Sequence, residues 1–249
     1  MKKAIKYIII VVCAFFLAIL TFLFINLCFA GFSCNSFVYG GKWEEREKVF
    51  ETADVESLKL RLSKGSLSVQ PSTDEKITIK YYDSKKCSYS FTEKDGALTI
   101  KQVNNSLFFP ISFKDTKYNV VLYLPENYGK DLRATLTDGN AKIENLFFED
   151  LDVAVGTGSV NLTAIKSSTI KATAVNGNVA FADVDGTILT FSTTNGNVLG
   201  SLPREMQHYY IKSIIKSSGK NNLPESFTEG AIYLTAQTYK GNITITFKT

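Results

Sequence analysis

The sequence predicts an all-β protein, a β-solenoid with about 19–23 residues per coil, preceded by one N-terminal transmembrane helix. Two observations carry this prediction. Glycine motifs recur at a fixed spacing in the C-terminal half, and a long uncharged apolar run fills the N-terminus. The composition suits a folded chain, because 45% of the 249 residues are hydrophobic and 21% are charged.

The apolar run extends over residues 7–32 and is long enough to cross a bilayer, since about 20 apolar residues span the hydrocarbon core as a helix. Three lysines lie within residues 1–6, and no charge follows until Lys42. The positive-inside rule therefore predicts a cytoplasmic tail (1–6), a single-pass helix in the cell membrane (7–32) and an extracytoplasmic remainder.

A cleaved signal peptide is the alternative for this segment. Its apolar region would have about 7–15 residues, and the observed run is longer. Residues 28–30 (Cys-Phe-Ala) make a passable cleavage site, and residues 31–34 resemble a lipoprotein cleavage box that lacks its leading aliphatic residue. Both alternatives place the rest of the chain outside the cytoplasm.

Residues 33–50 are predicted to be a solvated stalk, in which residues 43–49 are charged and look helical. Residues 51–125 are predicted to be a β-rich cap, because apolar and polar residues alternate in several short segments: 58–62, 66–69, 76–80, 97–100 and 118–125. Cys34 and Cys87 could form a disulfide, although two unpaired thiols are the favoured interpretation.

Residues 126–249 contain the repeat. Glycines recur 19 residues apart, and Gly219 and Gly241 then follow after 23 and 22 residues; the predicted structural turns are Gly139, Gly158, Gly177, Gly196 and Gly241. Each is expected to occupy a turn with positive φ. The residue after the glycine is often asparagine, so Asn140, Asn178 and Asn197 are expected to form a polar ladder.

Within each repeat, apolar residues alternate with polar ones on both sides of the glycine, which predicts two short strands per coil with a second turn near residues 185–187. One such unit cannot bury its apolar face alone. Stacked coils can, because equivalent residues then lie above one another, about 4.8 Å apart.

The strand ending in Leu124-Pro125, followed by repeated Thr-x-Gly-x-Val/Ile turns, resembles the bacterial "putative adhesin" family, a β-solenoid domain of unknown function. The resemblance covers residues 49–249 and is clearest at 124–202. It implies a domain that often follows one N-terminal membrane helix, with some members encoded beside envelope-stress signalling genes. The family has no agreed catalytic residues, so none is carried over to this chain.

Charge and composition exclude several functions. From Lys42 onward 25 basic side chains face 24 acidic ones, which speaks against nucleic-acid binding. Cofactors, metal ions and catalytic residues are expected to be absent, and His208 is interpreted as structural rather than as a general base. Asp150 and Asp152 share one strand face, but the next coil has Thr169 and Lys171 there, so no acidic ladder forms.

Aromatic residues give the remaining signal. Phe147 and Phe148 occupy turn positions that are polar in the next coils, and they are the possible partner patch. The alternative is packing against a second apolar cluster at residues 107–113.

Three functions remain open on the sequence. The first is a non-catalytic, adhesin-like interaction module of the cell envelope, whose partners are the bilayer and an envelope protein or glycan. The second is an accessory protein of envelope-stress signalling that acts on a membrane sensor. The third, least favoured, is a polysaccharide-acting enzyme, which would need a carboxylate pair on one coil face.

Overall fold

The computed structural model describes residues 12, 14–22, 42–104 and 116–248. The chain divides into two units: Met1–Glu44 with Ser84–Lys86, and Glu45–Asp83 with Cys87–Thr249. In the first unit, residues 12 and 14–22 are helical, and none of the helical stretches described is long and apolar enough to span a bilayer. Most of the predicted transmembrane segment, 7–32, lies outside the described residues.

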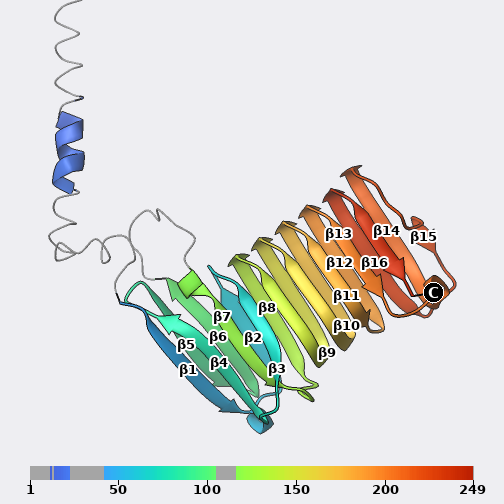
Figure 1. Ribbon diagram of the computed structural model, residues 1–249, viewed down its shortest axis with the longest axis horizontal. Coiled ribbons are helices and arrows are strands. Elements are labelled where there is room, and N and C mark those ends of the chain that lie inside the picture. The colour runs from blue at the N-terminus through green and yellow to red at the C-terminus, as the bar shows by residue number, and fades with distance from the viewer. Residues whose placement is uncertain (1–11, 13, 23–41, 105–115, 249) are drawn as a thin grey trace, which may run out of the picture. The chain divides into compact units, whose positions relative to one another are not determined.

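The second unit is a stack of β-coils with two long faces (Figure 1), which confirms the prediction of a mostly β chain. Face I consists of the strands that precede the turn glycines, together with one strand of the cap, residues 97–104. In spatial order they are β6 (Ala97–Asn104), β2 (Ser57–Leu62), β8 (Asp131–Asp138), the second halves of β9 (Ala141–Thr157) and β10 (Val160–Asn176), β12 (Ile188–Asn195), β16 (Ile232–Lys240) and β14 (Tyr209–Ser218).

Face II consists of the strands that follow the glycines, together with two strands of the cap, residues 76–83 and 120–125. In spatial order they are β4 (Lys76–Asp83), β7 (Val120–Pro125), β3 (Leu67–Ser72), the first halves of β9 and β10, β11 (Val179–Asp185), β13 (Val198–Leu202) and β17 (Ile243–Phe247). The remaining elements are β1 (Glu44–Glu51), β5 (Cys87–Lys94), β15 (Ser226–Phe227) and the 3₁₀ turns η1 (Thr52–Asp54), η2 (Thr116–Tyr118) and η3 (Met206–His208).

The spacing of 19 residues is the parallel register of the central coils, since Val160 pairs with Ala141 on one side and with Val179 on the other. Side chains that alternate inward form the core between the two faces. The column after the turn glycines is fully buried and consists of Ala141, Val160, Val179, Val198 and Ile243. Equivalent apolar residues thus stack upon one another and exclude water along the whole length of the unit.

The coils do not stack in sequence order at either end. β2 lies between β6 and β8, so the first coil of the chain is interior to a later one. At the other end, β16 lies between β12 and β14. The looser spacing at Gly219 and Gly241 arises because the chain passes over one coil position to form β14 and returns to fill it with β16 and β17.

Residues 44–51 form a strand, β1, which pairs with β4, so the short helix expected at 43–49 is wrong. Cross-strand pairing and an aromatic anchor outweigh the helical propensity of its charged residues. Phe50 is buried against Phe91 with ring centroids 5.7 Å apart, and Lys80 pairs with Glu47 at 3.4 Å. A charged edge strand of this kind discourages further strand pairing.

Three non-glycine residues, also 19 apart, occupy a second bend of the coils. Asn145, Ala164 and Asp183 have φ of 55°, 52° and 54°. The polar turn expected near 185–187 is also present, because β11 ends at Asp185 and β12 begins at Ile188. The left-handed residues precede it and lie within the first half of each coil. Asn and Asp tolerate this conformation, whereas alanine is strained in it.

Candidate functional site

The turn glycines form a column along one edge of the stack. Their φ values are positive: 139° at Gly139, 130° at Gly158, 154° at Gly177, 159° at Gly196 and 144° at Gly241. A Cβ built on Gly158 would lie 2.1 Å from the carbonyl oxygen of Gly139, and one on Gly177 would lie 2.0 Å from that of Gly158. Only glycine allows the coils to approach this closely.

Beside this column runs a ladder of asparagine and serine side chains, one from each coil. In spatial order its rungs are Asn119, Ser66, Asn140, Ser159, Asn178, Asn197 and Asn242. The Oδ1 of Asn140 accepts the backbone N–H of Ser159 at 2.8 Å, and the Oδ1 of Asn178 accepts that of Asn197 at 2.8 Å. Every rung thus uses its side-chain oxygen to hold the next coil.

The ladder forms one wall of an open groove on face II with a volume of about 540 Å³. The rungs that line it are Asn119, Ser66, Asn140, Ser159 and Asn178. Outward-facing side chains of the neighbouring strands line the rest: Val121, Ser68, Lys142, Asn161, Ala180 and Leu199. These side chains come from six adjacent strands, so the groove is about 24 Å long at about 4.8 Å per strand.

Sequence reasoning found the asparagine rungs of the repeat but missed Ser66 and Asn119, which come from the cap. The signal for Ser66 was present, because Gly65-Ser66-Leu67 matches Gly158-Ser159-Val160 in the repeat. Asn119 follows η2, without a preceding glycine, and only its place in the fold brings it to the ladder.

The two phenylalanines of the possible partner patch, Phe147 and Phe148, point to opposite sides of their strand. Phe148 is fully buried, with its ring edge-on to Tyr128 at a centroid distance of 6.1 Å. It belongs to the core and cannot contribute to a surface patch, because successive residues of a strand point to opposite sides. Phe147 is 48% exposed and lies outside the groove. The cluster at 107–113 lies outside the described residues.

The candidate catalytic groups stay apart. His208 is exposed in η3, and Asp152 pairs with Arg133 at 3.4 Å. Asp150 and Asp152 lie beside Thr169 and Lys171 in the next coil, as the repeat register predicted. Among the described residues, no group of three or more His, Cys, Asp or Glu side chains is placed to hold a metal ion.

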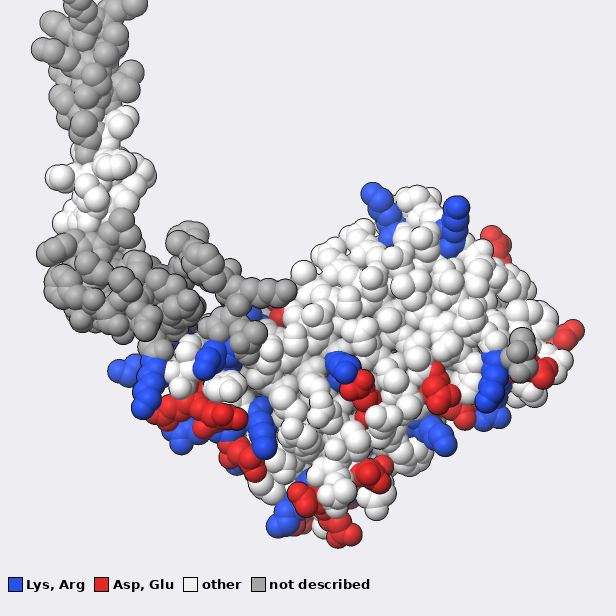
Figure 2. All heavy atoms as spheres, in the orientation of Figure 1, with Lys and Arg blue, Asp and Glu red and all other residues white. Residues whose placement is uncertain are grey.

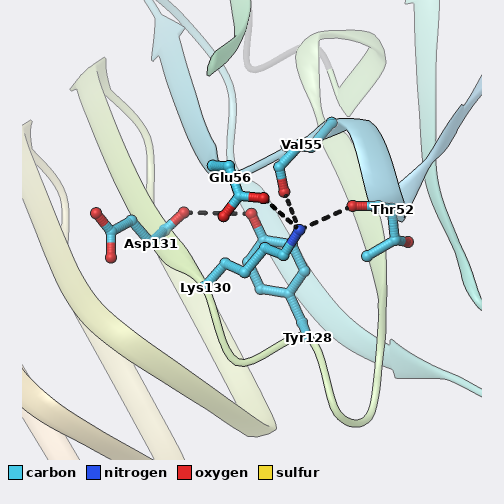
Figure 3. A network of polar contacts seen from close by, with 6 residues as sticks. All are labelled: Thr52, Val55, Glu56, Tyr128, Lys130 and Asp131. Carbon is cyan, nitrogen blue, oxygen red and sulfur yellow. Dashed lines mark hydrogen bonds and ion pairs between the residues drawn. The ribbon is translucent and has the colours of Figure 1, made fainter. Parts of the chain in front are cut away.

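A lysine-centred network joins η1 to the start of β8 (Figure 3). The amino group of Lys130 points at the carbonyl oxygens of Thr52, at 3.0 Å, and Val55, at 2.7 Å, and pairs with Glu56 at 3.4 Å. These acceptors are carbonyl oxygens at the end of a helical turn, which such a cation satisfies. Lys130 therefore has a structural role, holding the crossing between β1 and β2.

Cys87 is buried on β5, and burial raises the pKa of its thiol to about 11. A thiol with a raised pKa is a poor nucleophile at neutral pH. Nearby, the buried Gln102 accepts hydrogen bonds from the backbone N–H groups of Ser63, at 2.9 Å, and Lys64, at 2.8 Å, and donates to Tyr89 at 3.0 Å. Cys34, its predicted possible disulfide partner, lies outside the described residues.

An exposed aromatic row, which sequence reasoning missed, crosses the outer side of face I. Ile188, Tyr233 and Tyr210 are register partners on β12, β16 and β14, with exposed fractions of 45%, 55% and 36%. The rings of the two tyrosines are 5.3 Å apart. The inserted position of β16 brings these residues together, so the sequence order concealed the row.

Charged side chains gather over the β1 and β5 end of the stack and along one of its sides, and much of the remaining visible surface is uncharged (Figure 2). The groove on face II is also poor in charge, because Lys142 is its one charged lining residue and pairs with Glu144 at 2.8 Å.

Comparison with known proteins identifies a family and solved structures that are similar to this chain. The model of a family described as Toastrack DUF4097 matches residues 55–249. A putative cell adhesion protein from Clostridium sporogenes has a similar structure, with 18% sequence identity, a TM-score of 0.53, and coverage of 83% of this chain and 100% of the other. A putative adhesin from Bacteroides fragilis has 13% identity and a TM-score of 0.38, with coverage of 82% and 97%. The comparison with curated proteins gives no match. At 18% identity, the likeness to the Clostridium structure concerns the fold alone.

Proposed function

The chain belongs to the Toastrack DUF4097 family, and on this premise we propose that it is a membrane-tethered, non-catalytic adhesion module that binds through the groove on face II. The groove is the observation that carries the proposal. It is open and elongated, and hydrogen bonds between coils fix the rungs of its wall. A rigid, open surface of this length suits a long partner better than a small substrate, which binds in an enclosed pocket.

The description of the Clostridium relative as a putative cell adhesion protein agrees with this proposal. The groove contains no carboxylate pair for glycosidic cleavage among its described lining residues, so a polymer lying there would meet amides and hydroxyls. These groups bind sugars and peptides by hydrogen bonds without changing them.

The proposed tether is the apolar segment 7–32, with the lysines before it in the cytoplasm and the β-coils outside. An enzyme that is active only outside the cytoplasm, fused after Thr249, tests this topology. Activity of the fusion in intact cells, together with a mature N-terminus that retains Lys2, supports the tether. A mature protein that begins at Gly31 or Cys34 contradicts the tether but keeps the compartment.

The groove itself is tested with a matched pair of substitutions on β11. Ala180 lines the groove, whereas Ala182 lies two residues further along the same outward side and is outside it. Cells that display the full chain with Ala180→Trp are expected to lose adhesion to envelope-coated surfaces, because the indole fills the groove. Cells with Ala182→Trp are expected to adhere like the parent. Equal adhesion of all three contradicts binding through the groove.

The aromatic row on face I favours a second candidate, an accessory role in envelope-stress signalling through contact with a membrane sensor. Exposed tyrosines beside an aliphatic residue are typical of protein interfaces. Tyr233→Ser is then expected to change the signalling output of the sensor while adhesion stays unchanged. An unaltered output contradicts this candidate.

A further inference from the structure

We infer that the groove binds an extended linear polysaccharide that carries carboxylates at regular intervals; this rests on the groove-binding function proposed above. The inference comes from the hydrogen-bonding capacity that the ladder retains once it has joined the coils.

The side-chain oxygen of each groove-lining rung is already engaged. Asn119 accepts from the N–H of Ser66 at 3.0 Å, Ser66 from that of Asn140 at 3.2 Å, and Ser159 from that of Asn178 at 3.2 Å. Asn140 and Asn178 accept in the same way. Their Nδ2 amides have no acceptor among the described residues, so the asparagine rungs offer donors to a ligand.

A wall that offers hydrogen-bond donors favours a ligand that is rich in hydrogen-bond acceptors. An extended peptide would present its own N–H groups alternately with its carbonyls, and half of these polar groups would face other donors. A carboxylate presents only acceptors and forms the stronger, charge-assisted hydrogen bonds. The wall therefore favours a polymer whose repeated groups are carboxylates.

The charges of the groove agree with this ligand and disfavour polyphosphates. No Asp or Glu is among its described lining residues, so nothing there repels an anion. Its one cation, Lys142, is already paired with Glu144, whereas polyphosphates such as nucleic acids need clustered excess cations. Neutral amides in a row can bind spaced carboxylates without that excess.

The length and the opposite wall suit a chain of sugar rings. Five rungs, one per coil, extend over about 19 Å at about 4.8 Å per step, so several sugars are needed to contact them all. Val121, Ala180 and Leu199 give the other wall apolar surface, against which the C–H faces of sugar rings can pack.

The test removes the Nδ2 donors of the groove and preserves the side-chain oxygens that join the coils. Asn140→Asp with Asn178→Asp preserves an oxygen for the next coil but exchanges the Nδ2 donors for anionic oxygens. Asn197→Asp with Asn242→Asp makes the same exchange on rungs that do not line the groove. The full-length protein in detergent is titrated with fluorescent oligogalacturonate, and thermal melts confirm that both pairs remain folded.

We expect the groove pair to bind oligogalacturonate at least tenfold more weakly than the parent, and the control pair to bind like the parent. Methyl-esterified oligogalacturonate, which lacks the charge, is expected to bind the parent more weakly. Equal binding by the two pairs, absence of binding by the parent, or equally tight binding of polyglutamate overturns the inference. If Ala180→Trp still abolishes adhesion in such a case, the groove stands and only the ligand class is wrong. If Ala180→Trp also has no effect, the proposed function fails as well.

Discussion

Replacing Gly158 with alanine is expected to destabilise the stack more than an ordinary glycine-to-alanine change. Gly158 has a φ of 130°, where a residue with a side chain is strained by roughly 1–3 kcal/mol. Its Cβ would also lie 2.1 Å from the carbonyl oxygen of Gly139. That oxygen belongs to the backbone of the preceding coil, so the two coils must separate locally to relieve the contact.

Separation weakens the hydrogen bonds between these two coils. The N–H of Gly139 donates to the carbonyl oxygen of Thr157 at 2.9 Å, and that of Ser159 donates to Asn140 at 2.8 Å. Each such bond contributes about 1 kcal/mol net. Added to the backbone strain, their loss gives an expected decrease of about 3–5 kcal/mol in the free energy of unfolding, a large fraction of the stability of an ordinary domain.

The matched control is Gly96→Ala. Gly96 also has a positive φ, 71°, but the nearest atom to its Cβ is the flexible Cγ of Glu56 at 3.1 Å. It therefore carries the backbone strain without the contact between coils. Urea denaturation of the full chain, followed by circular dichroism, compares the two variants. Free energies of unfolding within about 1 kcal/mol of each other would refute the argument that coil contact demands glycine.

Three further predictions concern stability. Ala164→Asn is expected to raise the free energy of unfolding by about 0.5–1 kcal/mol, because Asn145 occupies the equivalent left-handed position and asparagine tolerates it; a lower value in urea denaturation contradicts this. Phe148→Ala is expected to lower the free energy of unfolding by about 3–5 kcal/mol, and Phe147→Ala by less than about 0.5 kcal/mol. Similar melting temperatures of the two variants would contradict the placement of Phe148 in the core. The pKa of Cys87 is raised from 9.0 to about 11, so its burial stabilises the fold fully below pH 9; this contribution, at most about 3 kcal/mol, is lost as the pH rises to 11. Urea denaturation at pH 8, 9, 10 and 11 should show the parent losing stability faster than Cys87→Ala, and parallel losses would contradict the assignment.

The repeat could be predicted from the sequence because its signal is local. A glycine followed two residues later by Val160 or Val179 repeats at the same spacing at which the strands pair, so counting residues gives the register. The asparagine rungs follow from the same count. Alternation also predicted which side chains enter the core, and it distinguishes buried Phe148 from exposed Phe147 once the strand is known to continue through both.

The order of the coils could not be predicted, because exchanging two neighbouring coils leaves every local pattern unchanged. The insertion of β16 beside β12 is a long-range choice, and it alone creates the row of Ile188, Tyr233 and Tyr210. The strand at residues 44–51 was missed for a related reason. Its charged residues favour a helix locally, and pairing with β4 decides the outcome.

The inserted coils change how this stack can come apart. In an ordinary repeat array a terminal unit contacts one neighbour, so it can unfold by itself and the array frays from its ends. Here β16 lies between β12 and β14, and β17 pairs with β13 and, through a single bridge, with Asn221. The first coil strands, β2 and β3, are enclosed between β6 and β8 and between β7 and β9. Neither the β2–β3 coil nor β16 can detach without separating strands on both of its sides. The coil stack is therefore complete only once residues 232–247 have taken their place between the neighbouring coils.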